Sequence, residues 1–173
     1  SNVWSYTYDE KDLLIASTNP LGETTTRGYD GLDQQTSVTD ARNNAVQLVY
    51  DTVGNLIKEV DALNEETVHT YDADGNRIST TDPLGNTTQF VYDELDRLIQ
   101  TIDPLGHTTT ISYDALSRRT MTTDANGNST ALEYDELGRL VKVTDAAGGE
   151  VLYTYDAVGN RTSMTEPNGN TTT

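Results

Sequence analysis

The chain has no cysteine among its 173 residues, and this absence removes several kinds of chemistry at once. Disulfide bonds, thiolate zinc sites and a cysteine nucleophile are excluded, and the redox compartment cannot be inferred. Phenylalanine and tryptophan occur once each, against ten tyrosines. With a hydrophobic content of only 34%, stability has to come from sheet hydrogen bonds and from apolar side chains that share one face.

Basic residues are also few. Eleven lysines and arginines stand against 28 carboxylates, so the formal net charge is −17. Such a surface repels nucleic-acid phosphates and anionic lipid head groups, and we expect neither a nucleic-acid partner nor membrane insertion. No apolar run approaches the roughly 20 residues of a spanning helix, and the N-terminus has no basic segment followed by an apolar core.

Tyrosine-aspartate pairs recur every 21 residues without an insertion or deletion. Such a period is typical of a repeat array. Because the first and last residues both fall within a copy, we interpret residues 1–173 as one array of eight in-register copies, truncated at both ends and part of a larger protein. The tyrosines that open the pairs are Tyr8, Tyr29, Tyr50, Tyr71, Tyr92, Tyr113, Tyr134 and Tyr155.

Each copy contains two turn signals about half a period apart, as at 135–139 and 103–107. In both, an aspartate can accept hydrogen bonds from the backbone ahead of it, and a glycine three residues later supplies a left-handed conformation. We expect this structural role for Gly54, Gly75, Gly138 and Gly159 in the first turn and Gly85, Gly106 and Gly127 in the second. In several copies this glycine is replaced, and the aspartates and asparagines among the replacements tolerate positive φ better than most residues. The replacements are Asp12, Asp33, Asp96 and Ser117 in the first turn, and Asn43 and Asn64 in the second.

Between the turns lie runs of five or six residues that are rich in β-branched and aromatic types, such as 87–92 and 98–102. In one run of each copy apolar residues alternate, so that Val46, Leu48 and Tyr50 share a face. We therefore predict an all-β fold. Its tandem 21-residue β-hairpin repeats, with about sixteen short strands, would form a continuous curved antiparallel sheet, a segment of a spiral shell.

The phrases YDELGRLVKVTD, YDAVGNRTSMTE and YDADGNRISTTD resemble the YD repeat of the rearrangement-hotspot (Rhs) family. The resemblance covers essentially the whole chain. This family includes large bacterial secreted or surface proteins, insecticidal toxin-complex subunits and the animal teneurins. Its hairpins spiral into a hollow shell, which in the bacterial toxins encloses a variable C-terminal toxic domain. For the eight tyrosines, the resemblance implies packing and hydrogen bonding in the wall, not catalysis.

The resemblance implies a structural, non-catalytic wall segment of a large secreted or cell-surface bacterial protein, with no cofactor. Its partners would be the remaining shell of the same polypeptide and the C-terminal effector that the shell encapsulates or presents. The alternative is an extracellular carbohydrate-binding or adhesion surface, because sugar faces pack on aromatic rings. We favour packing for the tyrosines, since each shares its face with an apolar residue such as Leu48, Phe90, Ile111 or Leu132.

No residues converge on a catalytic or metal site in the sequence. The aspartate-rich turns at 72–76 and 124–128 do not have the spacing of a calcium loop, because glycine interrupts at the fourth position. His69 lies at a strand position and His107 in a turn, so neither suggests a triad or a zinc site. Both are interpreted as tolerated surface or wall histidines.

Arg97, Arg118 and Arg139 share one position just after the first turn. We expect them to pair with turn carboxylates of adjacent units, where an exposed pair would add about 0 to 1 kcal/mol. We also expect the isolated fragment to self-associate. Residues 3–8 and 162–165 would form unprotected edge strands, which are templates for another chain.

Overall fold

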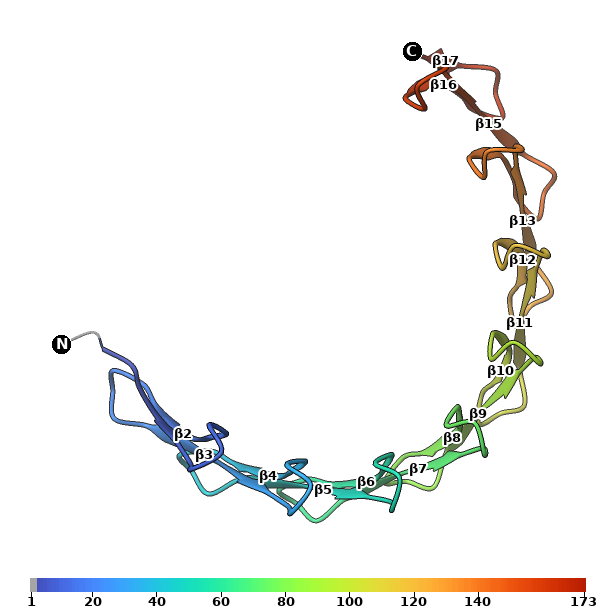
Figure 1. The fold of residues 1–173 in the computed structure, drawn as a ribbon. Coiled ribbons are helices and arrows are strands. Elements are labelled where there is room, and N and C mark those ends of the chain that lie inside the picture. The colour runs from blue at the N-terminus through green and yellow to red at the C-terminus, as the bar shows by residue number, and fades with distance from the viewer. Residues whose placement is uncertain (1–2) are drawn as a thin grey trace. The chain divides into compact units, whose positions relative to one another are not determined.

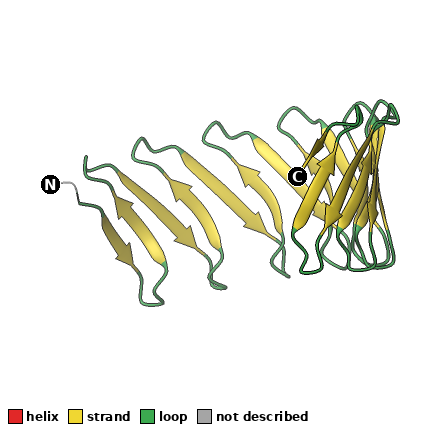
Figure 2. Cartoon of the chain, turned by 90° about the horizontal axis from the view of Figure 1, so that it is seen from above, coloured by secondary structure: helices red, strands yellow, loops and turns green. Residues whose placement is uncertain are grey.

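The computed structural model describes residues 3–173, and every regular element in this range is a β-strand (Figure 2). The chain divides into two units, Ser1–Thr88 and Gln89–Thr173, and each is described by itself. In the described range there is no helix that is long and apolar enough to cross a membrane.

In the first unit each strand pairs antiparallel with the next one along the chain, and the strands lie side by side in a single layer (Figure 1). The strands are β1 (Ser5–Tyr8), β2 (Leu14–Thr18), β3 (Thr24–Tyr29), β4 (Gln35–Thr39), β5 (Ala45–Tyr50), β6 (Leu56–Val60), β7 (Glu66–Tyr71) and β8 (Arg77–Thr81).

The second unit repeats this plan, again with antiparallel pairing of successive strands. Its first strand, β9 (Thr87–Tyr92), contains the boundary between the units. The others are β10 (Leu98–Ile102), β11 (Thr108–Tyr113), β12 (Arg119–Thr123), β13 (Ser129–Tyr134), β14 (Leu140–Thr144), β15 (Glu150–Tyr155), β16 (Arg161–Thr165) and β17 (Thr171–Thr172). The predicted all-β fold of tandem antiparallel hairpins is therefore confirmed.

The two hairpins of a repeat differ in register. Where β13 meets β14, Glu133 faces Lys142 but Tyr134 faces Leu140, so that Val141 is an extra residue. The same shift precedes the repeat tyrosine in every first hairpin, whereas the pairing across the second turn is regular, as between Thr144 and Glu150. An extra residue on one strand is a β-bulge, which bends the strand and increases its twist. The bulge thus gives each repeat its local curvature.

The turns follow one hydrogen-bonding scheme. In the turn after Tyr134, the carboxylate of Asp135 accepts bonds from the N–H groups of Leu137 and Arg139, at 3.0 and 2.9 Å. The N–H of Gly138 closes the turn on the Asp135 carbonyl, and Gly138 has a φ of 81°. Within residues 3–173, six non-glycine residues have positive φ, and they are the six named from the sequence: Asp12, Asp33, Asn43, Asn64, Asp96 and Ser117. That prediction is confirmed.

No hydrophobic side chain in residues 3–173 is fully buried. The repeat tyrosines are half-buried, apart from the exposed Tyr8, and the two most buried polar residues are Ser17 and His69. A single layer of strands explains this, because its side chains are covered only by their neighbours in the same sheet. The shared apolar face is therefore a half-exposed surface within each unit and not a closed core.

The expected edge strand at 162–165 is wrong for Met164 and Thr165. Strand β16 pairs with β15 on one side and with β17 on the other, where Met164 faces Thr172 and Thr165 faces Thr171. The reason is the turn from Glu166 to Asn170. It closes like the other second turns and returns the chain against β16.

Candidate functional site

The repeat tyrosines connect each hairpin to the one before it. Each ends an odd-numbered strand, and in six of the eight the hydroxyl donates to a main-chain carbonyl 15 residues earlier, as from Tyr155 to Leu140 at 2.7 Å. That carbonyl belongs to the first residue of the preceding even-numbered strand, beside the bulge. A buried or half-buried carbonyl needs such a partner. The same bond, at 2.8 to 3.0 Å, joins Tyr29 to Leu14, Tyr50 to Gln35, Tyr71 to Leu56, Tyr113 to Leu98 and Tyr134 to Arg119.

Replacing Tyr155 by phenylalanine should therefore lower the free energy of unfolding by about 1 kcal/mol, because the hydrogen bond to the Leu140 carbonyl is lost while the ring remains. Tyr153→Phe is the matched control, since the Tyr153 hydroxyl forms no hydrogen bond within the described chain. Urea titration of both variants measures the difference. Equal losses in the two would contradict a specific role for the Tyr155 hydroxyl.

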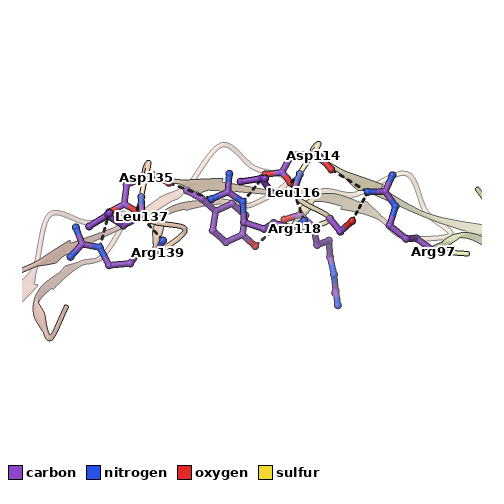
Figure 3. A network of polar contacts seen from close by, with 10 residues as sticks. Arg97, Asp114, Leu116, Arg118, Asp135, Leu137 and Arg139 are labelled. Atoms are coloured by element: carbon purple, nitrogen blue, oxygen red, sulfur yellow. Dashed lines mark hydrogen bonds and ion pairs between the residues drawn. The ribbon is translucent and has the colours of Figure 1, made fainter. Parts of the chain in front are cut away.

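Arginines make a second set of connections in the second unit (Figure 3). Arg118 donates from Nε to the Asp114 carboxylate of its own turn at 2.7 Å and from Nη1 to the backbone carbonyl of Asp135 in the next turn at 3.3 Å. Its guanidinium also lies over the ring of Tyr134, 4.7 Å from the centroid. One arginine therefore binds its own turn, the next turn and the next repeat tyrosine.

The same three contacts recur at the two neighbouring positions. Arg97 contacts Asp93, the Asp114 carbonyl and the Tyr113 ring, and Arg139 contacts Asp135, the Asp156 carbonyl and the Tyr155 ring. We call these three residues the arginine staples. Their ion pairs with the turn aspartates are 20% to 28% exposed, so they are partly shielded from water.

This arrangement corrects the expected partners of the arginines. The carboxylate lies in the same turn, four residues earlier, and the adjacent unit supplies a carbonyl and a ring. The turn geometry explains this result. One carboxylate oxygen of Asp114 accepts hydrogen bonds from the backbone N–H groups of Leu116 and Arg118. The other oxygen therefore remains available to accept a bond from the Arg118 side chain.

The first unit has no such staples in its described residues. The corresponding position holds Gln34 and Asn55, of which Gln34 donates to the Gly54 carbonyl at 3.4 Å and Asn55 binds only its own Asp51. Leu13 precedes them and Asn76 follows. In the first unit an exposed ion pair between Lys11 and Asp33, at 2.6 Å, connects two successive first turns, whereas the arginine staples belong to the second unit.

Ser117 shows how the staples affect a single substitution. Its φ of 61° is unfavourable for serine, yet its hydroxyl oxygen accepts a bond from Arg97 at 3.1 Å. Ser117→Gly should therefore be nearly neutral in the natural sequence and stabilising by about 1 kcal/mol when Arg97 is alanine. A double-mutant cycle of urea midpoints measures this coupling. The same gain in both backgrounds would rule out the coupling.

Hydrogen bonds set the ionisation of the turn aspartates. The Arg97 side chain lowers the pKa of Asp93, and the backbone N–H groups of Arg118 and Arg139 lower those of Asp114 and Asp135. In other turns the side-chain amide of an asparagine has this effect, as Asn128 lowers the pKa of Asp124. These carboxylates therefore stay ionised further into acid than free aspartate.

The two histidines differ in their surroundings. His69 is 6% exposed, and its ring nitrogens lie 3.0 Å from the Thr80 hydroxyl on β8 and 3.3 Å from the Glu59 carboxylate on β6. The sequence did not indicate that Glu59, His69 and Thr80 meet, because they lie on three different strands. His107 pairs with Asp103 in an exposed turn. Within residues 3–173 no group of three or more histidines and carboxylates is placed to hold a metal ion.

A single-layered array of in-register hairpins, connected through side chains to neighbouring backbone, defines a repeat protein of the β-hairpin class. The RHS Repeat family model matches residues 8–45, 50–87, 71–108, 92–129, 120–151 and 134–171. The chain therefore belongs to the RHS repeat family. No curated protein sequence matches it significantly.

Solved structures with a similar fold are TcdB2-TccC3 toxin complexes. The crystal structure of TcdB2-TccC3-Cdc42 is 15% identical with a TM-score of 0.62, and the complex without its hypervariable C-terminal region gives the same values. The Tc holotoxin pore of Photorhabdus luminescens is 16% identical with a TM-score of 0.61. Each match covers 94% of this chain and 11% of the other. At this identity the likeness concerns the fold.

Proposed function

We propose that this chain is a structural, non-catalytic segment of an Rhs shell wall, in a large secreted or cell-surface bacterial protein whose C-terminal effector the shell encloses or presents. Family membership and the fold shared with the TcdB2-TccC3 complexes support this proposal. Residues 1–173 would form one stretch of the array, with the remaining shell and the effector as partners.

The observation that carries the proposal is the use of side chains to join one repeat to the next. Tyrosine hydroxyls and arginine staples bind the carbonyls of neighbouring hairpins, and the turns are closed by their own backbone bonds. Such loops are too short and too fully bonded to assemble a catalytic constellation. A continuous wall is the role that these contacts serve.

The test uses the full-length polypeptide that contains this segment. Limited proteolysis should leave the effector intact while the shell is closed and should degrade it after Gly138→Val damages one hairpin of the wall. The free effector, digested in parallel, provides the reference rate. Cleavage of the effector in the intact protein at that same rate would overturn the proposal.

A glycan-binding surface is the second candidate, and one feature favours it. The rings of Trp4 and Tyr6 are stacked, with centroids 6.4 Å apart and planes 12° from parallel, and both are 55% exposed. Saturable glycan binding that Trp4→Ala abolishes would support this candidate. Tyr155→Ala is the control, because the Tyr155 ring is covered by Arg139 and its hydroxyl is already bonded.

A further inference from the structure

At one junction of the first unit, the position of the arginine staples holds a side chain that is too short to act as one. Asn55 donates from Nδ2 to the carboxylate of Asp51 at 3.0 Å, just as Arg118 donates from Nε to Asp114 at 2.7 Å. Within residues 3–173, however, the Asn55 side chain makes no bond to the next turn. The first of the three staple contacts is therefore present at this junction, and the other two are missing.

The groups that a staple contacts in the next repeat have counterparts beside Asn55. The carbonyl of Asp72 accepts the N–H that closes its own turn at 3.3 Å, which leaves a lone pair for a further donor. Tyr71 donates its hydroxyl to the Leu56 carbonyl at 2.8 Å, the same bond that holds the stapled tyrosines. In the described range no cation covers the Tyr71 ring, whereas a guanidinium lies 4.7 or 4.8 Å from the ring centroid of each stapled tyrosine.

An open cavity of about 630 Å³ lies at this junction, between the hairpins β5–β6 and β7–β8. Its lining includes every group that a staple would contact, with Asp51 and Asn55 from one first turn and Tyr71 and Asp72 from the next. Apolar side chains form much of the remaining surface, namely Val49, Val53, Ile57 and Val68. The volume lies within the range of small-ligand sites, about 300 to 1,000 Å³.

The charges around the cavity favour a cation. The backbone N–H of Asn55 lowers the pKa of Asp51, so this carboxylate stays ionised. Among the lining residues the only lysine or arginine is Lys58, and Glu66 pairs with it at 2.9 Å. A guanidinium suits the site better than an ammonium, because its planar fork donates to a carboxylate and a carbonyl together while its face stacks on an aromatic ring.

We propose that this cavity binds the guanidinium group of an arginine side chain that belongs to another polypeptide segment. The group donates to the Asp51 carboxylate and to the Asp72 carbonyl and stacks on the Tyr71 ring, which are the contacts that Arg118 makes within the chain (Figure 3). The apolar lining contacts the aliphatic stem of the arginine and a neighbouring apolar residue, so a peptide fills the cavity better than free arginine does. This recognition site goes beyond the role of a wall.

Titration of the chain with the peptide acetyl-Leu-Arg-Leu-amide, followed by NMR, tests the proposal. The amide signals of Val53, Asn55 and Ala73 should shift saturably. The citrulline counterpart has nearly the same shape but no charge and should bind at least about tenfold more weakly, and free arginine amide at least about threefold more weakly. Equal affinity of the arginine and citrulline peptides, or shifts spread evenly over the acidic turns, would overturn the proposal. Equal affinity of free arginine amide would contradict a polypeptide ligand.

Variants of the staple position give a second test. Asn55→Arg supplies the missing staple from within the chain, so it should abolish peptide binding and raise the urea midpoint. Asn128→Arg is the matched control, because Asn128 makes the same bond to Asp124 in a second turn and the added charge there should leave binding unchanged. Equal loss in the two variants would show that the peptide responds only to net charge. That result, or undiminished binding to folded Asn55→Arg, would overturn the proposal.

The converse substitution tests whether the staple contacts define the site. Arg118→Asn should expose the Asp114 carboxylate, the Asp135 carbonyl and the Tyr134 ring to the same peptide. A second set of saturable shifts should then appear at Leu137, with the original set at Val53 unchanged. A folded Arg118→Asn chain that binds the peptide only beside Asn55 would contradict the use of the staples as a template.

Discussion

Replacing Gly138 by valine should lower the free energy of unfolding by at least about 2 kcal/mol and disrupt one hairpin. Gly138 has a φ of 81°, a conformation that costs ordinary L-residues roughly 1 to 2 kcal/mol and β-branched ones more. An added Cβ would also lie 3.5 Å from Nη1 of Arg118, the atom that donates to the Asp135 carbonyl. That distance is an ordinary van der Waals contact, so backbone strain is the main cause of the loss, and crowding of the arginine staple would come only from the two methyl groups of valine.

Hydrogen exchange locates the damage. Protection should fall in β13 and β14, which flank the turn, and persist in distant hairpins such as β5 and β6, because the stability of a repeat array is close to a sum of nearest-neighbour terms. Loss of protection throughout the chain would show that the array unfolds as one cooperative block.

Two controls separate the causes of the Gly138→Val effect. Gly138→Asn should be tolerated much better, since Asn43 and Asn64 adopt φ values of 63° in sister turns. Gly127→Val introduces the same strain at a φ of 85° where no atom lies within 4 Å of the new Cβ. The excess loss in Gly138→Val over Gly127→Val measures the contribution of the Arg118 contacts.

The sequence predicts the backbone of this protein well, because the requirements of each turn are contained within five consecutive residues. Ser117 illustrates this point: the period alone places it at the glycine position, and its φ is positive as expected. The strands follow from the same period, since two turns per repeat leave only the short β-branched runs between them.

The side-chain partners were harder to predict. Arg118 reaches a carbonyl 17 residues away, and His69 binds residues on both adjacent strands. Which side chains meet across strands depends on register, and the bulge shifts that register by one residue in each first hairpin. The alternation of polar and apolar residues does not reveal the bulge.

Acid should destabilise the array strongly, because ten turn aspartates have pKa values lowered from the ordinary value of 3.8. These pKa values are lowered mainly by hydrogen bonds that the carboxylates accept from backbone and side-chain donors of the same turn. Burial has the largest single influence on Asp72 and opposes the shift, but the bonds from Asn76 and its neighbours outweigh it. The ten are Asp40, Asp51, Asp72, Asp82, Asp93, Asp103, Asp114, Asp124, Asp135 and Asp156.

The direction follows from proton linkage. A carboxyl group with a lower pKa in the folded chain binds fewer protons there than in the unfolded chain. Its contribution to stability is therefore fully present when the pH lies above the ordinary aspartate pKa of 3.8. The contribution disappears as the pH falls through the folded pKa. Protonation also relieves repulsion within a chain of net charge −17, and that relief opposes the loss. The lowered pKa values indicate that the turn hydrogen bonds outweigh the repulsion at these ten carboxylates.

Urea midpoints should therefore be nearly constant from neutral pH to about pH 5 and should fall steeply towards about pH 2. Asp124→Asn is the matched variant. Asn19 already occupies the corresponding position of another second turn and accepts the same backbone bonds from Leu21 and Glu23, so the variant turn can form. The variant should lose less stability between the two ends of the pH range than the natural chain does, because one titrating group is gone. A midpoint that rises on acidification would show that charge repulsion, and not turn hydrogen bonding, dominates the electrostatics of the array.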